Sequence, residues 1–446
     1  MGASTAQHQI DPVERIRLLR RAYRYEDARQ LARAQVAEAR RDRDPSPLPL
    51  QLELATLELD FGCFGQAEAL FAEARAASAT SAAWEARAST GLVLTQWEQA
   101  RYEEAEVTAS AALARARADL VPDAPELVRL LVAAASLAIE LEDFPRAQAM
   151  LDDALTSARA AETETERDEL LGEALGALGT LRRVKGNYRV AEQILRDALA
   201  HSERGFGSES IEVASALNDL GILFKFTGSF DEAHAHYERS VALYERALGP
   251  DNIALAALHH NLGGLAHAER NPSAGELHGR RSVEIRQATF GPDHVYVAID
   301  KAAYAAILAD LNRRSEAEQL LREALPVLER DLGPDHNEVA VYTNNLAAIH
   351  HRNGDYTQAE PLYRRALAIK EANLGVESPA LAGTLNNLGV VVKAMGNYSD
   401  ADLLYRRALK LLEGNVTDDH PVLASCRRNH AKLLAELERT NSKDSE

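Results

Sequence analysis

Glycine recurs every 42 residues along the C-terminal part of this chain, and no other feature constrains the fold as strongly. The five periodic glycines are Gly207, Gly249, Gly291, Gly333 and Gly375. In the three central copies the glycine is followed by Pro-Asp. A fixed period of this length indicates an array of small structural units, because each unit is too short to bury its own apolar face and has to stack on its neighbours.

A second motif keeps the same period. It consists of a glycine, any residue and an aromatic residue, with an alanine three residues later, as in Gly186/Tyr188/Ala191, Gly228/Phe230/Ala233, Gly354/Tyr356/Ala359 and Gly396/Tyr398/Ala401. Toward the N-terminus the aromatic and the alanine recur at looser spacing, as Tyr25/Ala28, Phe64/Ala67, Tyr102/Ala105 and Phe144/Ala147. Copies at residues 270–272 and 312–314 keep the register without the aromatic. The pattern predicts ten copies.

The residues between the two motifs have the apolar spacing of α-helices, as Leu217, Leu220 and Phe224 illustrate. We expect the periodic glycine to end a helix in the left-handed conformation, the proline to prevent its continuation, and the aspartate to cap the next helix. Asp335 and Glu338 have the spacing of a capping box. The small alanine lets the two helices of a pair approach closely, and the aromatic of the same motif is expected to fill the remaining gap.

Stacked helix pairs predict an all-α solenoid of about ten helix-turn-helix repeats. We predict divergent repeats over residues 1–165, regular repeats with a C-terminal capping helix over 166–436, and a polar tail over 437–446. Pro272 and Gly279 fall inside one helix pair, where both residue types weaken helix packing. They indicate either a hinge or drift in a redundant repeat.

The motifs Gly-x-Tyr-x-x-Ala and Leu-Tyr-Arg-Arg-Ala-Leu (362–367 and 404–409) resemble the tetratricopeptide repeat. The 42-residue period, Asn-Asn-Leu-Gly (386–389) and Leu-Gly-Pro-Asp-His resemble the kinesin light chain subtype of that repeat over residues 166–446. The resemblance extends to the repeat domain only, because no heptad run precedes the array. It implies a right-handed superhelical solenoid whose concave groove is lined by positions 2, 5, 9, 12 and 13 of each first helix.

Each repeat is numbered from the start of its first helix so that Leu220 and Gly221 are positions 7 and 8, and the five regular repeats start at residues 214, 256, 298, 340 and 382. In this register asparagine recurs at position 5, where the resemblance implies a role in holding the backbone or terminal carboxylate of a bound peptide. The alternative is hydrogen bonding between helices of the array. Asp310 is the single acid at the groove positions of the five repeats that start between residues 214 and 382, so a ligand with acidic residues fits. The candidate groove residues are Asn218, Lys225, Phe226, His260, His267, Asn344, His351, Arg352, Asn386 and Lys393.

Composition excludes several classes of protein. The net charge of -18 argues against general nucleic-acid binding, which requires a concentrated basic surface. Cys63 and Cys426 are too few for a disulfide framework. Neither a signal core nor an apolar run long enough to span a membrane is present, so we expect a cytoplasmic protein without membrane contact. The oligomeric state stays open.

Two clusters of titratable residues are considered as functional sites. Six histidines between His234 and His278 lack the convergent spacing of a metal site. The first helix carries a basic stripe that is either a docking patch for an acidic partner or the polar outer face of a capping repeat; it comprises Arg17, Arg20, Arg21 and Arg24.

The sequence contains no phosphate-binding loop and no nucleophile with a matching base, so we predict a protein that is not an enzyme and needs neither cofactor nor metal. The leading hypothesis is a scaffold or adaptor that binds a protein or extended peptide in the groove. The alternatives are a signalling receptor whose solenoid changes shape on binding a peptide or small effector and, less favoured, an enzyme or an accessory subunit of one.

Overall fold

The computed structural model describes residues 11–41, 48–78, 80–413 and 421–443, with the side chains of residues 421 and 439–443 left aside. The described residues form 21 α-helices and one short 3-10 helix, with no strand. The degenerate motif copy at 416–420 lies outside the described residues. The chain divides into two compact units, residues 1–269 and 270–446. This division falls in a degenerate turn of the repeat pattern, and the predicted boundary at residue 165 stays a prediction.

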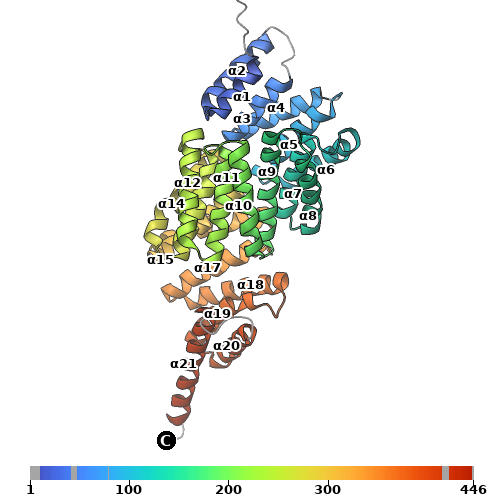
Figure 1. Cartoon of the computed structure of the whole chain (residues 1–446). Helices are drawn as coiled ribbons and strands as arrows, with labels where there is room; N and C mark the ends of the chain where they lie inside the picture. The colour runs from blue at the N-terminus through green and yellow to red at the C-terminus, as the bar shows by residue number, and fades with distance from the viewer. Residues whose placement is uncertain (1–10, 42–47, 79, 414–420, 444–446) are drawn as a thin grey trace, which may run out of the picture. The chain divides into compact units, whose positions relative to one another are not determined.

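Figure 1 shows the helices of unit 1 in colours from blue to yellow. In its described residues unit 1 holds six helix pairs and one further first helix. Its helices are α1 (Pro12–Arg21), α2 (Tyr25–Arg41), α3 (Leu48–Asp60), α4 (Phe64–Ala77), α5 (Ala82–Glu98), α6 (Tyr102–Asp119), α7 (Pro125–Glu140), α8 (Phe144–Arg159), α9 (Glu164–Val184), α10 (Tyr188–Gly205), α11 (Ile211–Thr227), α12 (Phe230–Leu248) and α13 (Ile253–Ala268).

Unit 2 begins with a second helix and ends with a capping helix. Its elements are α14 (Pro272–Phe290), α15 (Val295–Asp310), α16 (Arg314–Asp331), α17 (Asn337–Asn353), α18 (Tyr356–Leu374), η1 (Pro379–Leu381), α19 (Ala382–Ala394), α20 (Tyr398–Leu412) and α21 (Pro421–Lys443). Helix α21 continues past residue 436, where the capping helix was expected to end, because residues 437–443 contain neither proline nor glycine. The predicted all-α architecture of repeated helix pairs is confirmed.

Within each unit the helices form an inner and an outer layer. Successive first helices contact one another, as α5 contacts α7 and α7 contacts α9 in unit 1, and as α17 contacts α19 in unit 2. Among the described residues, successive second helices make no comparable contact. Each unit therefore curves with its first helices on the inner side. We call the surface along these first helices the inner face.

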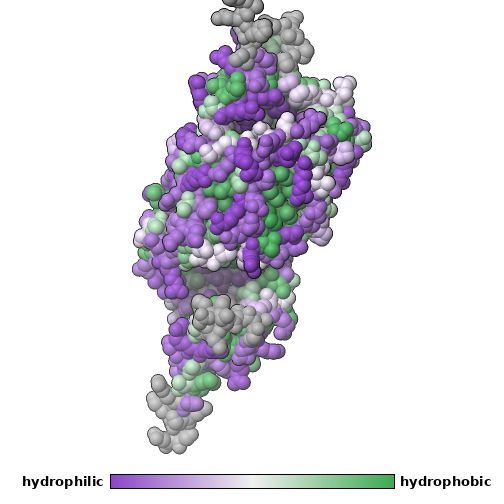
Figure 2. Space-filling view, viewed as in Figure 1, coloured by the Kyte–Doolittle hydropathy of each residue, from purple (hydrophilic) through white to green (hydrophobic). Residues whose placement is uncertain are grey.

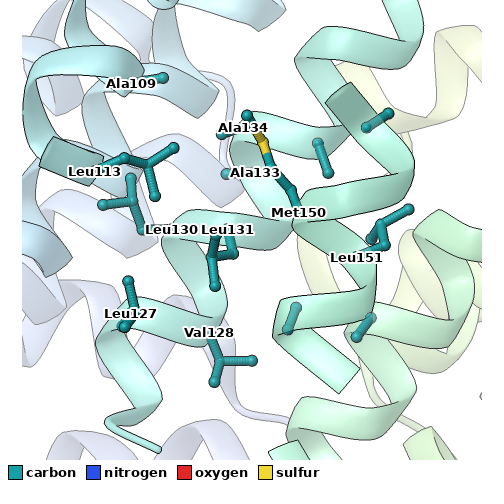
Figure 3. Close-up of a cluster of buried hydrophobic side chains, with 14 of the residues drawn as sticks. Ala109, Leu113, Leu127, Val128, Leu130, Leu131, Ala133, Ala134, Met150 and Leu151 are labelled. Carbon is teal, nitrogen blue, oxygen red and sulfur yellow. The ribbon is translucent and has the colours of Figure 1, made fainter. Parts of the chain in front are cut away.

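Alanine and leucine fill the space between the layers. Figure 3 shows one such cluster in unit 1, where Ala109 and Leu113 of α6 meet Leu130 of α7, and Met150 of α8 packs nearby. These side chains are at most 6% exposed. Burial of apolar surface at about 25 cal/mol per Å² is the main stabilising term for such an array. The motif alanines Ala191, Ala233, Ala359 and Ala401 are fully buried, as expected.

The aromatic ring that fills the gap between paired helices is not the one that the motif suggested. In the regular repeats Tyr188 and Tyr398 are more than a third exposed. The buried rings lie seven residues later in α12, α18 and α20; they are Tyr237, Tyr363 and Tyr405. The motif aromatic begins the second helix, at the edge of the unit, whereas a residue two turns further along faces the middle of the first helix.

Glycine at position 8 of the first helix makes room for two of these tyrosines, Tyr237 and Tyr405, whereas the repeat of Tyr363 has Ala347 at that position. A Cβ atom on Gly221 would lie 2.6 Å from the ring of Tyr237, and one on Gly389 would lie 2.8 Å from the ring of Tyr405. In the degenerate repeat that contains α14, the glycine stands on the second helix and the tyrosine on a first helix. There Gly279 replaces the tyrosine, and the ring of Tyr304 from α15 occupies the space, 2.6 Å from where a Cβ would stand. Gly279 thus accommodates a neighbour.

The helix starts differ from the sequence expectation by one residue. Asn252, His294 and His336 are the capping residues of α13, α15 and α17, and each accepts a hydrogen bond from a backbone N–H of the first turn. The preceding aspartates, including Asp335, do not cap. The predicted capping box is therefore wrong, because the Pro-Asp turn occupies one residue more than expected. Pro272 stands at the first position of α14, where proline disturbs no helical hydrogen bond.

Candidate functional site

The candidate residues at position 5 lie where successive first helices meet. Asn218 Oδ1 accepts a hydrogen bond of 3.0 Å from Asn261 Nδ2 in unit 1. In unit 2, Asn386 Oδ1 accepts one of 3.0 Å from Asn429 Nδ2. Forty-two residues earlier, Asn344 Oδ1 accepts one of 3.3 Å from the hydroxyl of Thr384. In all three cases the next first helix or the capping helix engages the amide oxygen, which leaves the amide N–H groups on the other end of the side chain.

Hydrogen bonding within the array, the alternative role for these asparagines, is thus present at all three positions. It does not prevent binding, because it uses one of the two ends of each amide. Burial separates the three residues: Asn218 and Asn344 are partly exposed, whereas Asn386 is only 6% exposed and also donates a long bond of 3.5 Å to Asn387. Asn218 and Asn344 are therefore the accessible members of the set.

Lys225 and Phe226 belong to a cluster of aromatic and cationic groups in unit 1. The ring of Phe226 is 56% exposed and stacks on Tyr188, with 6.3 Å between the centroids. The Arg183 guanidinium and the Lys225 ammonium lie 5.8 Å and 5.7 Å from the Phe226 centroid. Burial, followed by the charge of Arg183, lowers the pKa of Lys225. Burial also raises the pKa of Asp219, beside Arg183, to about 6.

The predicted histidines of unit 1 lie on α13. His260 is partly exposed and His267 is exposed. On the preceding helix α12, His234 Nε2 lies 3.1 Å from Glu269 Oε2. No group of three histidine, cysteine or acidic side chains in the described part of the chain is arranged to hold a metal ion.

Two of the predicted cations of unit 2 are neutralised within the unit. Lys393 Nζ lies 2.6 Å from Glu436 Oε1 of the capping helix, and Arg352 Nη1 lies 3.6 Å from Asp310 Oδ1. His351 stands beside Tyr356, with 6.1 Å between the ring centroids, and burial together with Arg352 lowers its pKa. Lys393 and Arg352 therefore already form ion pairs within unit 2, which partly compensate their charges.

Sequence reasoning missed a polar chain that links α17, α18 and α19 of unit 2. Lys370 of α18 donates to Thr384 of α19 at 3.2 Å, and Thr384 in turn bonds to Asn344. Only first-helix positions were considered as groove residues, and Lys370 lies near the end of a second helix. The 42-residue period contained the signal, because residues 286 and 370 are both basic and two periods apart.

The inner side of unit 1 is more highly charged than the predicted groove. Arg129 of α7 lies 3.1 Å from Glu169 and 3.4 Å from Glu173 of α9. The N-terminal basic stripe also pairs within the unit, as Arg17 bonds to Glu53 at 2.9 Å and Arg24 to Asp27 at 2.7 Å. The face of the molecule seen in Figure 2 is mostly hydrophilic, with apolar residues interspersed.

Comparison with known protein families decides the identity of the fold. The tetratricopeptide repeat matches residues 170–246, 225–288, 254–330, 302–372 and 338–414, which together cover more than half of the chain. The chain belongs to the tetratricopeptide repeat family. Repeat scaffolds of this family typically mediate contacts between proteins and are typically non-catalytic. No curated protein matches the chain.

Several solved structures resemble this tetratricopeptide protein. BtubC (BKLC) from P. vanneervenii is 23% identical over 58% of this chain and 96% of its own, with a TM-score of 0.41. A putative kinesin light chain with TPR-like repeats from Podosopora anserina is 18% identical over 48% and 99%, with a TM-score of 0.40. A Rap protein complexed with Competence and Sporulation Factor is 14% identical over 80% and 99%, with a TM-score of 0.49.

Within the described ranges, every helix is too short or too polar to cross a lipid bilayer.

Proposed function

We propose that this chain is a cytoplasmic scaffold or adaptor that binds an extended segment of another protein on its inner faces. The observation that carries the proposal is the fixed orientation of the position-5 asparagines. Each gives its amide oxygen to the next helix, and the two accessible ones, Asn218 and Asn344, have N–H groups that we propose face the ligand. An extended peptide offers unpaired carbonyl oxygens, which such donors complement.

The expected affinity follows from the small number of accessible donors. A net hydrogen bond contributes about 1 kcal/mol, or roughly fivefold in affinity. Two accessible amides therefore cannot hold a peptide alone. Further contact comes from the exposed ring of Phe226 and its flanking cations Arg183 and Lys225 in unit 1. We propose a weak, reversible interaction that depends on several contacts.

The proposal is tested by retention of peptides on the immobilised full chain. The probe is a mixture of capped short peptides with random sequence. Asn218→Ala combined with Asn344→Ala should lower total retention at least fivefold, since both accessible amides are lost. Gln358→Ala, an exposed residue of the second helix α18, is the matched control and should change nothing. Equal retention by the double variant and the wild type contradicts the proposal.

A second candidate function is a receptor that changes shape on binding. The observation that favours it is a contact between distant repeats of unit 1, where α2 meets α12. Such a contact can be made or broken as a unit, which a signalling protein requires. Hydrogen exchange of α1–α4 in the presence of retained peptides tests it. Unchanged protection of these helices at saturating peptide counts against the receptor.

A further inference from the structure

Four polar side chains of unit 1 lie close together without pairing. They are Arg183 of α9, Asp219 and Lys225 of α11, and Tyr237 of α12. Burial has the largest influence on the pKa of the last three, and the second is in each case the charge of Arg183, which lowers the pKa. In the described part of the chain, none of the four side chains forms a hydrogen bond or an ion pair. Arg183 therefore stands within electrostatic reach of three groups to which it is not bonded.

Two of these groups are buried as well as unpaired. Tyr237 is fully buried, and neither its hydroxyl nor Nε of Arg183 has a hydrogen-bond partner among the described residues. Buried polar groups normally have such partners. In unit 2 the equivalent Tyr363 also has an unpaired hydroxyl, but Arg352 near it forms an ion pair with Asp310. The cluster in unit 1 differs because its cations keep their capacity to donate hydrogen bonds.

The two cations of the cluster lie beside one accessible ring and beside open space. The Arg183 guanidinium is 5.8 Å and the Lys225 ammonium 5.7 Å from the centroid of Phe226, whose ring is more than half exposed. A Cβ on Gly264 of α13 would lie 3.3 Å from Lys225 Nζ and would meet no other atom within 4 Å. A Cβ on Gly176, seven residues before Arg183 on α9, would meet none at all. The two glycines thus leave room for a ligand on the inner face.

The positive charge of this cluster is not balanced by the chain itself. Arg129, another arginine on the inner face of unit 1, has Glu169 at 3.1 Å. Asp219 opposes the charge of Arg183 at a distance, but Lys225 has no acid that acts on it: burial, followed by Arg183, lowers its pKa. Two cations that repel each other suit a group with two negative charges. A phosphate monoester carries nearly two at neutral pH, whereas a carboxylate carries one.

We propose that Arg183 and Lys225 bind a phosphorylated side chain of the bound segment, next to the ring of Phe226. Both cations donate to the phosphate oxygens, in the way that clustered basic side chains recognise phosphorylated segments. This inference rests on the proposed function, in which the same three residues contact the ligand, and adds the chemical class of one ligand group. Phosphoserine and phosphotyrosine share this chemistry, and the ring of the latter also packs on Phe226.

The test measures the affinity of the full chain for three small probes by isothermal titration calorimetry. The probes are phosphoserine, phosphotyrosine and glutamate, each acetylated and amidated so that the side chain is the sole charged group. The wild type should bind capped phosphoserine about tenfold more tightly than capped glutamate, because the second negative charge adds a charge-assisted hydrogen bond. Tighter binding of phosphotyrosine than of phosphoserine identifies an aromatic phosphate as the ligand group, and equal binding an aliphatic one.

Four variants assign that binding to this cluster. Arg183→Met and Lys225→Met should each lower the affinity for capped phosphoserine about tenfold. Lys185→Met removes an equal charge from an exposed residue at the end of α9 and should change nothing. Asp219→Asn should raise the affinity several-fold, because it removes the acid nearest to Arg183; a purely structural role of the cluster predicts no such gain. Equal far-ultraviolet circular dichroism checks that each variant is folded.

The outcomes separate this inference from the proposed function. If capped phosphoserine binds no better than capped glutamate, or if Lys185→Met weakens it as much as Lys225→Met does, the phosphate site is wrong. Retention of unphosphorylated random peptides by the wild type still supports the proposed function in that case, and loss of that retention contradicts the proposed function whichever probe binds. A phosphate preference that both methionine variants lose and Asp219→Asn strengthens supports the site.

Discussion

Unit 1 is joined by contacts between distant repeats, whereas the described helices of unit 2 are joined by contacts between neighbours. In unit 1, Asn252 Nδ2 donates to the backbone oxygen of Asp60 at 2.9 Å, and the backbone N–H of Ile211 donates to the Tyr25 hydroxyl at 3.4 Å. Ala247 and Leu248 share a buried cluster with the N-terminal helices. In the described part of unit 2, every helix contacts only elements close to it in the chain order.

The difference shows that one repeat family supports two kinds of stability. A linear array is stabilised repeat by repeat, so its ends open easily. The contact of α2 with α12 links the beginning of unit 1 to its sixth helix pair, so the helices between them open together. We expect unit 1 to unfold more cooperatively than unit 2.

A charged cluster stands where the distant repeats of unit 1 meet. Arg20 of α1 lies 3.5 Å from Glu53, 3.5 Å from Asp60 and 4.0 Å from Glu212. Glu53 is only 2% exposed and also accepts from Arg17 and Arg87, at 2.9 Å and 2.8 Å. Two of the four N-terminal arginines predicted as a docking patch or outer face, Arg17 and Arg20, thus serve the internal structure of unit 1, whereas Arg21 and Arg24 are exposed.

The largest effect is expected from Glu53→Ala, which removes the acid at the centre of this cluster. Breaking a buried ion pair from one side costs about 3 kcal/mol, because the remaining charges lose their partner. Both tryptophans, Trp84 and Trp97, lie in unit 1. Urea unfolding followed by tryptophan fluorescence therefore reports unit 1 alone, while far-ultraviolet circular dichroism reports both units. The urea midpoint of the fluorescence transition, which reports unit 1, should fall. The midpoint of the dichroism phase that belongs to unit 2 should not change.

Asp153→Ala is the matched control for that variant. Asp153 forms an ion pair of 2.8 Å with Arg117, and both side chains are more than half exposed. An exposed pair contributes about 0–1 kcal/mol. If Glu53→Ala and Asp153→Ala shift the fluorescence midpoint equally, the charged cluster does not hold unit 1 together.

A pH effect confined to unit 1 is the next in size. Burial, helped by Glu212 and Glu53 and opposed by Arg20, raises the pKa of Asp60 from 3.8 to about 7. A raised folded-state pKa means that Asp60 stabilises the fold while protonated and that this contribution is lost as the pH rises through 7. The slope is at most about 1.4 kcal/mol per pH unit. Unfolding of Asp60→Asn, followed by fluorescence, should show a gain over the wild type that grows with pH up to about 7.

The opposite trend comes from other acids of the same unit. Hydrogen bonds and charges of nearby arginines lower the pKa of Glu53 and Glu58 despite their burial, so their contribution is lost as the pH falls. Comparing Asp60→Asn with the wild type at each pH removes that background. A constant difference between the two proteins at all pH values would show that Asp60 is ionised in the folded unit.

The sequence predicted the repeated elements because their causes are local. The alanines of the second motif are buried as expected. Gly249 and Gly291 end their helices with positive φ of 87° and 84°, but with ψ of 163° and 166°, so the predicted left-handed helical conformation is wrong there. The closure of unit 1 was not predictable, because Asn252 and Asp60 are 192 residues apart and no periodic pattern links them. The capping error had a local cause: whether Asp335 or His336 caps α17 depends on one residue of turn geometry.

The candidate site shows the same limit. Repetition at one position identified Asn218, Asn344 and Asn386, and their roles as ligand-binding groups stay predictions. The bonds that orient them come from the next repeat, and one of these donors, Thr384, occurs in only one repeat. Lys393 illustrates why charge counting along the sequence overestimates a binding surface: its partner Glu436 belongs to the capping helix and lies outside every repeat position considered.

The smallest change in stability is expected from exchanging alanine and glycine at one turn position that the two units share. Ala100 in unit 1 adopts φ 58°, in the left-handed region, at the place where Gly396 stands in unit 2. A non-glycine residue there costs about 1 kcal/mol. Ala100→Gly should therefore raise the urea midpoint measured by fluorescence. Gly396→Ala should lower only the midpoint of the dichroism phase of unit 2, because alanine is strained at positive φ. The loss should stay small, since a Cβ on Gly396 would meet no atom within 4 Å. If Gly396→Ala also moves the tryptophan signal, the units unfold together and the contrast between them is wrong.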